Sequence, residues 1–157
     1  MKFALNGALT LGTLDGANIE IREAVGPENF FLFGLTADQA EATLRNGYRP
    51  AEVVAADPEL KAVLDLIRSG FFSPEDPDLF HPLLDALLTE DRYLVLADFR
   101  AYAGAQGEVA RAYAGDPDGW ARKALLNVAR VGRFSSDRSI HQYARDIWGI
   151  SAVQVTL

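Results

Sequence analysis

The first 24 residues, MKFALNGALTLGTLDGANIEIREA, combine a single lysine, Lys2, with spaced glycines and a dense apolar background. Residues 3–9 suit a short helix that is ended by a glycine. Residues 9–13 form an apolar run bounded by glycine and by an Asp-Gly pair, which indicates a buried strand followed by a turn. The sequence therefore predicts a short helix and then a strand, with Lys2 ahead of both.

A second strand is expected after one more helix. Asp15 is placed to cap a helix over residues 17–26, which a Gly-Pro pair stops. Residues 29–35, NFFLFGL, contain four large apolar residues in a row and are interpreted as a buried strand. A strand, a helix and a strand in this order predict two parallel strands joined by a right-handed crossover. Residues 1–35 are therefore expected to form a βαβ-like segment.

Residues 36–157 are expected to be mainly helical. Thr36 is interpreted as an N-cap, with Gln39 at the capping-box position. Two Asp-Pro pairs, at Asp57 and Asp116, each place proline at a first helical position behind a capping aspartate. The expected helices cover residues 36–47, 50–56, 58–69, 77–89, 98–114, 116–131 and 135–148.

Two segments of this helical part are less regular. Residues 69–78, SGFFSPEDPD, form a loop that the Phe71-Phe72 pair is expected to hold against the body of the protein. Residues 93–99, YLVLADF, are compatible with a third short strand or with the entry to a helix. Two or three parallel strands do not make a stable open sheet. The sequence therefore predicts an α/β, helix-rich part of a larger domain, with few parallel strands.

The composition argues against several classes of protein. A chain of 157 residues, 49% of them hydrophobic, can bury the core of a globular domain. Its net charge of −7 argues against a nucleic-acid-binding protein. No basic amphipathic stripe, long apolar stretch or signal peptide points to a membrane. The absence of cysteine excludes disulfides and thiolate metal sites, and it fits a cytoplasmic protein.

Several other constellations favour structural roles. The glycines match neither G-x-G-x-x-G nor a Gly-Lys-Ser/Thr loop, so they are interpreted as turn residues. A catalytic triad can be assembled on paper from Ser135, Ser136, Asp137 and His141, but Ser-Ser-Asp before an apolar-periodic run is typical of a helix N-cap. Two distant histidines without a carboxylate cluster predict no metal site.

Three aromatic residues of the later helices, Trp120, Tyr143 and Trp148, lie at core-like spacing. We interpret them as packing residues rather than as a platform for a sugar. Their side chains are therefore expected to be buried.

Lys2 has two interpretations from its residue type alone. A lysine near a chain terminus is ordinarily a solvated charge. Burial in an apolar pocket would lower its pKa toward neutrality, and a neutral amine forms a Schiff base with an aldehyde such as pyridoxal phosphate. The apolar residues Phe3, Ala4 and Leu5 that follow are compatible with burial without establishing it.

The opening stretch resembles the segment around the cofactor lysine of the glycogen (α-glucan) phosphorylases. The resemblance continues through ENFFLFG, SGFFSPEDPDLF, DRYLVLADF and GRFSSDRSIHQYARDIWGI, and so covers essentially the whole chain. It implies a pyridoxal-phosphate-dependent, allosteric glycosyltransferase of glycogen metabolism in the cytoplasm. Such an enzyme transfers a terminal glucosyl unit of an α-1,4-glucan to inorganic phosphate and yields glucose 1-phosphate with retained configuration. It also implies that residues 1–157 are the helix-rich second half of the Rossmann-like C-terminal domain of a two-Rossmann-domain glycosyltransferase.

The resemblance assigns a role to one residue. Lys2 matches the lysine that forms the internal aldimine with pyridoxal phosphate, and in this family the cofactor's phosphate does the acid–base work. Lys2 is thus expected to anchor the cofactor, and no residue of this chain is assigned a catalytic or metal-binding role. Asn6, Asp15 and Asn18 match family positions as well, but their types are those of turn and cap residues.

Phosphorylases are several times longer than this chain, which is therefore expected to be a fragment. We expect the isolated chain to be inactive and not to retain pyridoxal phosphate, because the other walls of the site are missing. The alternative is a helical module without catalysis that binds itself or a partner protein. An uncovered sheet edge invites such pairing and is compatible with a homo-oligomer.

Overall fold

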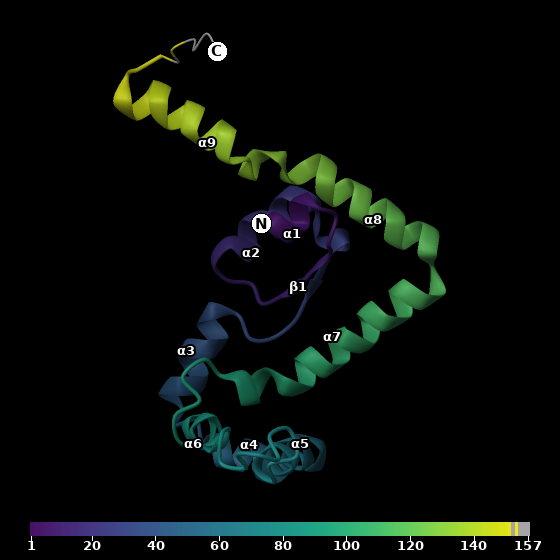
Figure 1. The fold of residues 1–157 in the computed structure, drawn as a ribbon, viewed down its shortest axis with the longest axis vertical. Helices are drawn as coiled ribbons and strands as arrows, with labels where there is room; N and C mark the ends of the chain where they lie inside the picture. Colours follow the sequence, from purple (N-terminus) through teal and green to yellow (C-terminus); the bar gives the residue numbers. More distant parts are fainter. Residues whose placement is uncertain (152, 154–157) are drawn as a thin grey trace. The chain divides into compact units, whose positions relative to one another are not determined.

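The computed structural model describes residues 1–151 and 153 and is shown as a ribbon in Figure 1. The described part is rich in helices and contains a small parallel sheet of two strands, β1 and β2, as the sequence predicts. The elements are α1 (Lys2–Leu5), β1 (Thr10–Gly12), α2 (Gly16–Val25), η1 (Pro27–Asn29), β2 (Phe30–Leu32), α3 (Ala37–Arg45), α4 (Pro50–Ala56), α5 (Pro58–Arg68), α6 (His81–Thr89), α7 (Val95–Gly115), α8 (Pro117–Arg130), η2 (Val131–Phe134), α9 (Ser136–Tyr143) and η3 (Ala144–Trp148).

The chain divides into two compact units. The first comprises Met1–Thr10, Gly16–Phe31 and Arg111–Leu157, and the second comprises Leu11–Asp15 and Leu32–Ala110. The strand–helix–strand order of the opening is confirmed, although each strand has only three residues. Beyond the strands, the backbone N–H of Phe33 donates to the carbonyl of Gly12 at 3.2 Å.

Three of the predicted caps, at Thr36, Asp57 and Asp116, form as expected. The hydroxyl of Thr36 accepts from the backbone N–H of Gln39, whose side-chain oxygen accepts from the N–H of Thr36, so α3 begins with a complete capping box. The carboxylate of Asp57 accepts two backbone N–H groups of α5, each at 3.0 Å. Asp116 accepts from the N–H of Gly119 at 2.9 Å at the start of α8. Each capping side chain satisfies helix donors that have no partner inside the helix.

The core of the first unit is formed by residues from the start of the chain and from the segment after α8. Its buried members share apolar side chains and come from α1, α2, β2 and η2: Ala4, Ile21, Val25, Phe30 and Val131. Leu5 and Phe134 pack against this cluster. The one-turn helix α1 is too short to be stable alone, so its order depends on these tertiary contacts.

The core of the second unit is a leucine cluster between α5, α6 and α7. Its buried members are Leu60, Leu64, Leu84 and Leu96. Beside it, the buried carboxylate of Asp91 accepts the N–H groups of Val95 and Leu96 and so caps α7. Asp91 also accepts the hydroxyl of Tyr48 at 2.6 Å. Burial, followed by this hydrogen bond, raises the pKa of the Tyr48 phenol above its usual value.

Two expectations for the irregular segments are corrected. Helix α6 begins at His81, not at residue 77, because the preceding residues form turns. Gly70, with a φ of +76°, packs there against Pro77, where a Cβ would lie 2.7 Å from the proline ring. The Phe71 and Phe72 rings remain exposed and contact each other, so they do not hold the loop against the body.

The open alternative for residues 93–99 is resolved in favour of a helix entry. Helix α7 begins at Val95, so no strand forms in this segment. The preceding turn places Leu94 at a φ of 55°, and its side chain is buried. A leucine in this left-handed conformation is uncommon, which explains why the sequence did not indicate the turn.

An ion pair ties the start of α5 to α7. The guanidinium of Arg100 donates to both carboxylate oxygens of Asp57 and, at 2.5 Å, to Glu59. The hydrogen bond from Arg100 holds the pKa of the Asp57 carboxyl below its ordinary value. A carboxyl with a lowered folded-state pKa stabilises the protein above its unfolded-state pKa, and this contribution is lost as the pH falls through the folded-state pKa.

Replacing Arg100 with methionine is therefore expected to lower the stability of the second unit at neutral pH. The difference from the parent chain should shrink below about pH 4, near the ordinary pKa of aspartate. Urea unfolding of both chains across this pH range measures the effect. Arg92→Met is the control, because Arg92 is exposed and has no ion pair among the described residues. A difference that stays constant with pH would contradict the prediction.

Candidate functional site

Lys2 is the first residue of α1, and its side chain is exposed. Its backbone carbonyl accepts the side-chain amide of Asn6 at 2.8 Å, which closes the end of this short helix. Its amine makes no hydrogen bond or ion pair with the residues that the structure describes. The other two lysines of the chain both have partners: Lys61 pairs with Asp65, and Lys123 donates to the carbonyl of Glu28.

Helix α8 supports the segment that carries Lys2. Helices α1 and α8 are in contact (Figure 1). The side-chain amide of Asn127, in α8, donates to the carbonyl of Ala8 at 2.8 Å. Gly7, at a φ of +84°, lies over α8, where a Cβ would be 3.6 Å from Val128 and 3.7 Å from Ala124. The turn after α1 therefore lies directly on this helix.

The same helix holds the carboxyl end of α2. Arg130 donates to the carbonyl of Val25 at 2.6 Å and lies 3.5 Å from the carboxylate of Glu28. Lys123, about two helical turns earlier along α8, donates to the carbonyl of Glu28. Side chains of α8 thus bind the backbone on both sides of the first strand–helix unit.

The other residues of the opening motif have local roles. Asn6 closes α1, as described above. The carboxylate of Asp15 accepts the hydroxyl of Thr13 at 3.1 Å, in the turn before α2. Asn18 lies in the first turn of α2. These contacts agree with Asn6 as the C-cap of α1 and with Asp15 as a turn residue.

Lys2 lines none of the four main cavities in the described part of the chain. The most apolar has a volume of about 430 Å³ and lies in the second unit. Its walls come from the residues that directly follow β1 and β2 and from α7 and the turn before it: Thr13, Phe33, Tyr93, Val95, Asp98, Phe99 and Tyr102. One carboxylate oxygen of Asp98 accepts a hydrogen bond from the backbone N–H of Leu35 at 2.9 Å.

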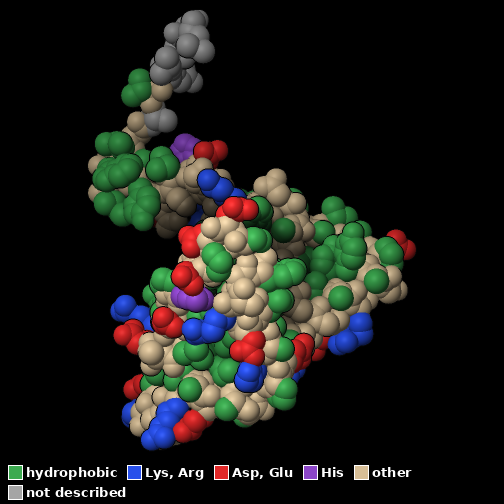
Figure 2. Space-filling view, turned by 60° about the horizontal axis from the view of Figure 1, so that its bottom comes forward, with side chains coloured by type: hydrophobic (Ala, Val, Ile, Leu, Met, Phe, Trp, Pro, Cys, Tyr) green, Lys and Arg blue, Asp and Glu red, His purple; other side chains and the backbone are tan. Residues whose placement is uncertain are grey.

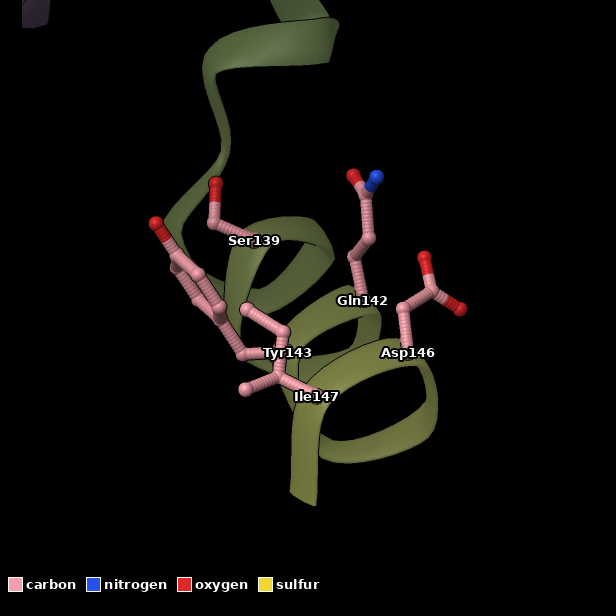
Figure 3. Close-up of a pocket in the computed structure, with 5 residues that line it drawn as sticks. All are labelled: Ser139, Gln142, Tyr143, Asp146 and Ile147. Atoms are coloured by element: carbon pink, nitrogen blue, oxygen red, sulfur yellow. The ribbon is translucent and has the colours of Figure 1, made fainter. Parts of the chain in front are cut away.

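A further groove of about 210 Å³ lies on α9 and η3. Figure 3 shows Ser139 and Tyr143 on one side of it and Gln142 and Asp146 on the other, with Ile147 between them. All five side chains come from a single helical stretch. The groove is therefore a surface depression between neighbouring turns rather than an enclosed site.

The three aromatic residues that were predicted to pack differ in their contacts and exposure. Trp120 packs against Phe31 and Tyr113, as expected. Tyr143 and Trp148 stack on each other but are 49% and 54% exposed, so the expectation that they are buried is wrong. Hydrophobic side chains gather on this part of the surface (Figure 2). The exposed members on α9, on η3 and just after η3 are Ile140, Tyr143, Ile147, Trp148 and Ile150.

The weaker candidates for chemistry are not assembled among the described residues. Ser135 is the N-cap residue of α9, and its carbonyl accepts the hydroxyl of Ser139. No hydrogen bond joins His141 to a serine or an aspartate in the part that the structure describes. The same part holds no cluster of three histidine or carboxylate side chains able to bind a metal ion. None of its helices has both the length and the hydrophobicity needed to cross a bilayer.

Comparison with known proteins gives a consistent result. The family model of carbohydrate phosphorylases matches residues 1–150. Glycogen phosphorylase of Synechocystis sp. is 61% identical over 157 residues, which are 100% of this chain and 18% of that protein. The brain form of glycogen phosphorylase from Homo sapiens is 49% identical over 150 residues, 96% of this chain and 18% of that protein. The muscle form from Ovis aries is 47% identical over the same length and share.

Proposed function

Because this chain belongs to the carbohydrate phosphorylase family, we propose that it is the segment of an α-glucan phosphorylase that carries the cofactor lysine. The chain spans 18% of the length of the curated relatives that it matches. In the proposal, residues 1–157 form the helix-rich second half of the Rossmann-like C-terminal domain, with a βαβ-like part over residues 1–35. The complete enzyme transfers glucosyl units of an α-1,4-glucan to inorganic phosphate.

The observation that carries this proposal is the state of Lys2. Its amine is exposed and has no competing partner among the described residues, whereas Lys61 and Lys123 are both engaged. An amine without a partner is available to form a Schiff base once it loses its proton, and in the proposal the burial that favours this loss comes from the rest of the enzyme. The residues present therefore fit the anchor, and we assign the other walls of the cofactor pocket to parts of the enzyme outside this segment.

The chain's own contribution is to hold that amine in place. Pyridoxal phosphate held by Lys2 would supply a phosphate group for acid–base chemistry. Lys2 fixes the position of the cofactor and is not itself assigned a proton-transfer step. The contacts of α1 with α8 set where the amine lies, through the buried Ala4 and the hydrogen bond from Asn127 to Ala8.

The test uses a chimera of Synechocystis glycogen phosphorylase in which the matching 18% is replaced by this chain. We expect the chimera to bind pyridoxal phosphate and to release glucose 1-phosphate from glycogen and inorganic phosphate. The isolated chain with the same additions should release none, because catalysis depends on positioning between both walls of a site. A chimera that folds but binds no cofactor would contradict the proposal.

Turnover by the isolated chain would contradict the fragment interpretation. Sedimentation of the same preparation separates the second candidate, a self-associating helical module. Concentration-dependent oligomers in solution would favour that candidate for the isolated chain, and the exposed apolar residues on α9 and η3 are the observation behind it.

A further inference from the structure

We propose that Asn127 is a positioning residue for Lys2, because its amide fixes the turn that joins the helix of this lysine to the first strand. The inference rests on the proposed function, which makes Lys2 the cofactor anchor. Asn127 lies on α8, far from Lys2 in the sequence, and no motif of the chain marks it.

The burial of Asn127 is complete. Its side chain is 0% exposed, and Asn127 is the only residue of α8 that is buried. The side-chain oxygen has no hydrogen-bond partner among the described residues, whereas the amide nitrogen donates to Ala8. A buried polar atom without a partner costs stability, which an apolar residue of equal size would avoid. The donor nitrogen is therefore the group that makes asparagine useful at this position.

The hydrogen bond acts at a sensitive point of the backbone. The acceptor is the backbone carbonyl of Ala8, which lies between α1 and β1 and is 119 positions from Asn127 in the sequence. The N–H of Ala8 in turn donates to the carbonyl of Phe3 at 3.0 Å. Phe3 is the neighbour of Lys2, so a continuous path of two hydrogen bonds runs from α8 to the backbone beside the lysine.

The helix that carries Lys2 depends on such support. Helix α1 has four residues, and one helical turn does not persist without tertiary contacts. Ala4 is buried beneath it and supplies an apolar contact, but such a contact is non-directional. The directional hydrogen bond from Asn127 sets the position of the turn at Gly7 and Ala8. The amine of Lys2 is exposed, so its position relative to α8 is set through this backbone rather than through its own side chain.

The first arm of the test uses the isolated chain and needs no cofactor. In Asn127→Leu, amide hydrogen exchange at residues 5–8 is expected to rise about tenfold, because the lost donor frees the turn after α1. The matched control is Arg130→Met, on the same helix, which removes the hydrogen bond to Val25 at the end of α2 instead. Equal exchange at residues 5–8 in Asn127→Leu and in the parent chain would overturn the inference, whatever the cofactor does.

The second arm uses the phosphorylase chimera and asks about the cofactor. Asn127→Leu is expected to weaken pyridoxal phosphate binding by about tenfold and to shift the pH titration of the lysine-bound absorbance band. Arg130→Met should leave both unchanged, although both variants lower the melting temperature of the cofactor-free chimera. Asn127→Asp, which keeps the shape but removes the donor, should behave like Asn127→Leu.

The outcomes separate the two proposals. Unchanged cofactor binding in Asn127→Leu, or an equal loss in Arg130→Met, would overturn the positioning role while the proposed function stands. A parent chimera that binds no cofactor at Lys2 would count against the proposed function, and the exchange at residues 5–8 would then decide whether Asn127 fixes the turn.

Discussion

The Lys2→Arg chimera is expected to lose phosphorolysis by at least about a hundredfold, since losing the anchor misplaces the cofactor relative to the substrate. Arginine keeps the positive charge and the length of lysine, but its guanidinium stays protonated and does not form a Schiff base. Lys2 is exposed, so arginine fits at this position without disturbing the core around Ala4. The variant thus removes the nucleophilic amine and little else.

Two measurements check this prediction. The first is the release of glucose 1-phosphate, and the second is the cofactor that stays with the protein after free pyridoxal phosphate has been removed. The control is Lys61→Arg, because Lys61 is an exposed helix residue paired with Asp65 and arginine can keep that pair. A Lys2→Arg chimera that retains the cofactor and most of its turnover would show that another group holds pyridoxal phosphate.

The sequence predicted those parts of the structure whose chemistry is local. The capping box of Thr36 and Gln39 lies within one helical turn, and its geometry follows from residue type and spacing. Asp57 likewise caps a helix that begins at the next residue, a proline. The two strands were located because short apolar runs between turn residues are typical of buried strands.

What the sequence could not predict are the contacts between distant segments. Asn127 and Ala8 are 119 positions apart, and Asp57 and Arg100 are 43 apart. The sequence does not show whether a polar residue such as Asn127 or Arg100 is buried or exposed. Only the packing of α8 and α7 shows what each of these residues contacts. The candidate site divides in the same way: the motif marks Lys2, whereas its support on α8 is visible only in the structure.

The two exposed aromatic residues also show that burial cannot be predicted from sequence spacing alone. Tyr143 and Trp148 have the spacing of core residues, which indicates only that they share a helix face. Whether that face is covered depends on what packs against it, and among the described residues these rings contact each other. Periodicity therefore predicts the direction of a side chain, and burial has to come from a partner surface.

Leu84→Ala is expected to lower the free energy of unfolding of the second unit by about 2–5 kcal/mol. Leu84 is 0% exposed and lies in the leucine cluster that joins α5, α6 and α7. Removing most of its side chain loses the transfer free energy of the buried methyl groups and leaves a cavity that the surrounding helices fill only in part. The cost is large relative to the 5–15 kcal/mol that stabilises a typical domain.

Leu83→Ala is the matched control for this prediction, because Leu83 precedes Leu84 on α6 and is 53% exposed. The same substitution there changes helix propensity in the same way but removes little buried surface. Amide hydrogen exchange in α5 and α6 measures the opening free energy of each variant against the parent chain. If the two leucines prove equally costly to replace, Leu84 does not lie in a closed core. A clear excess for Leu84 would establish that the core of the second unit forms from this chain alone.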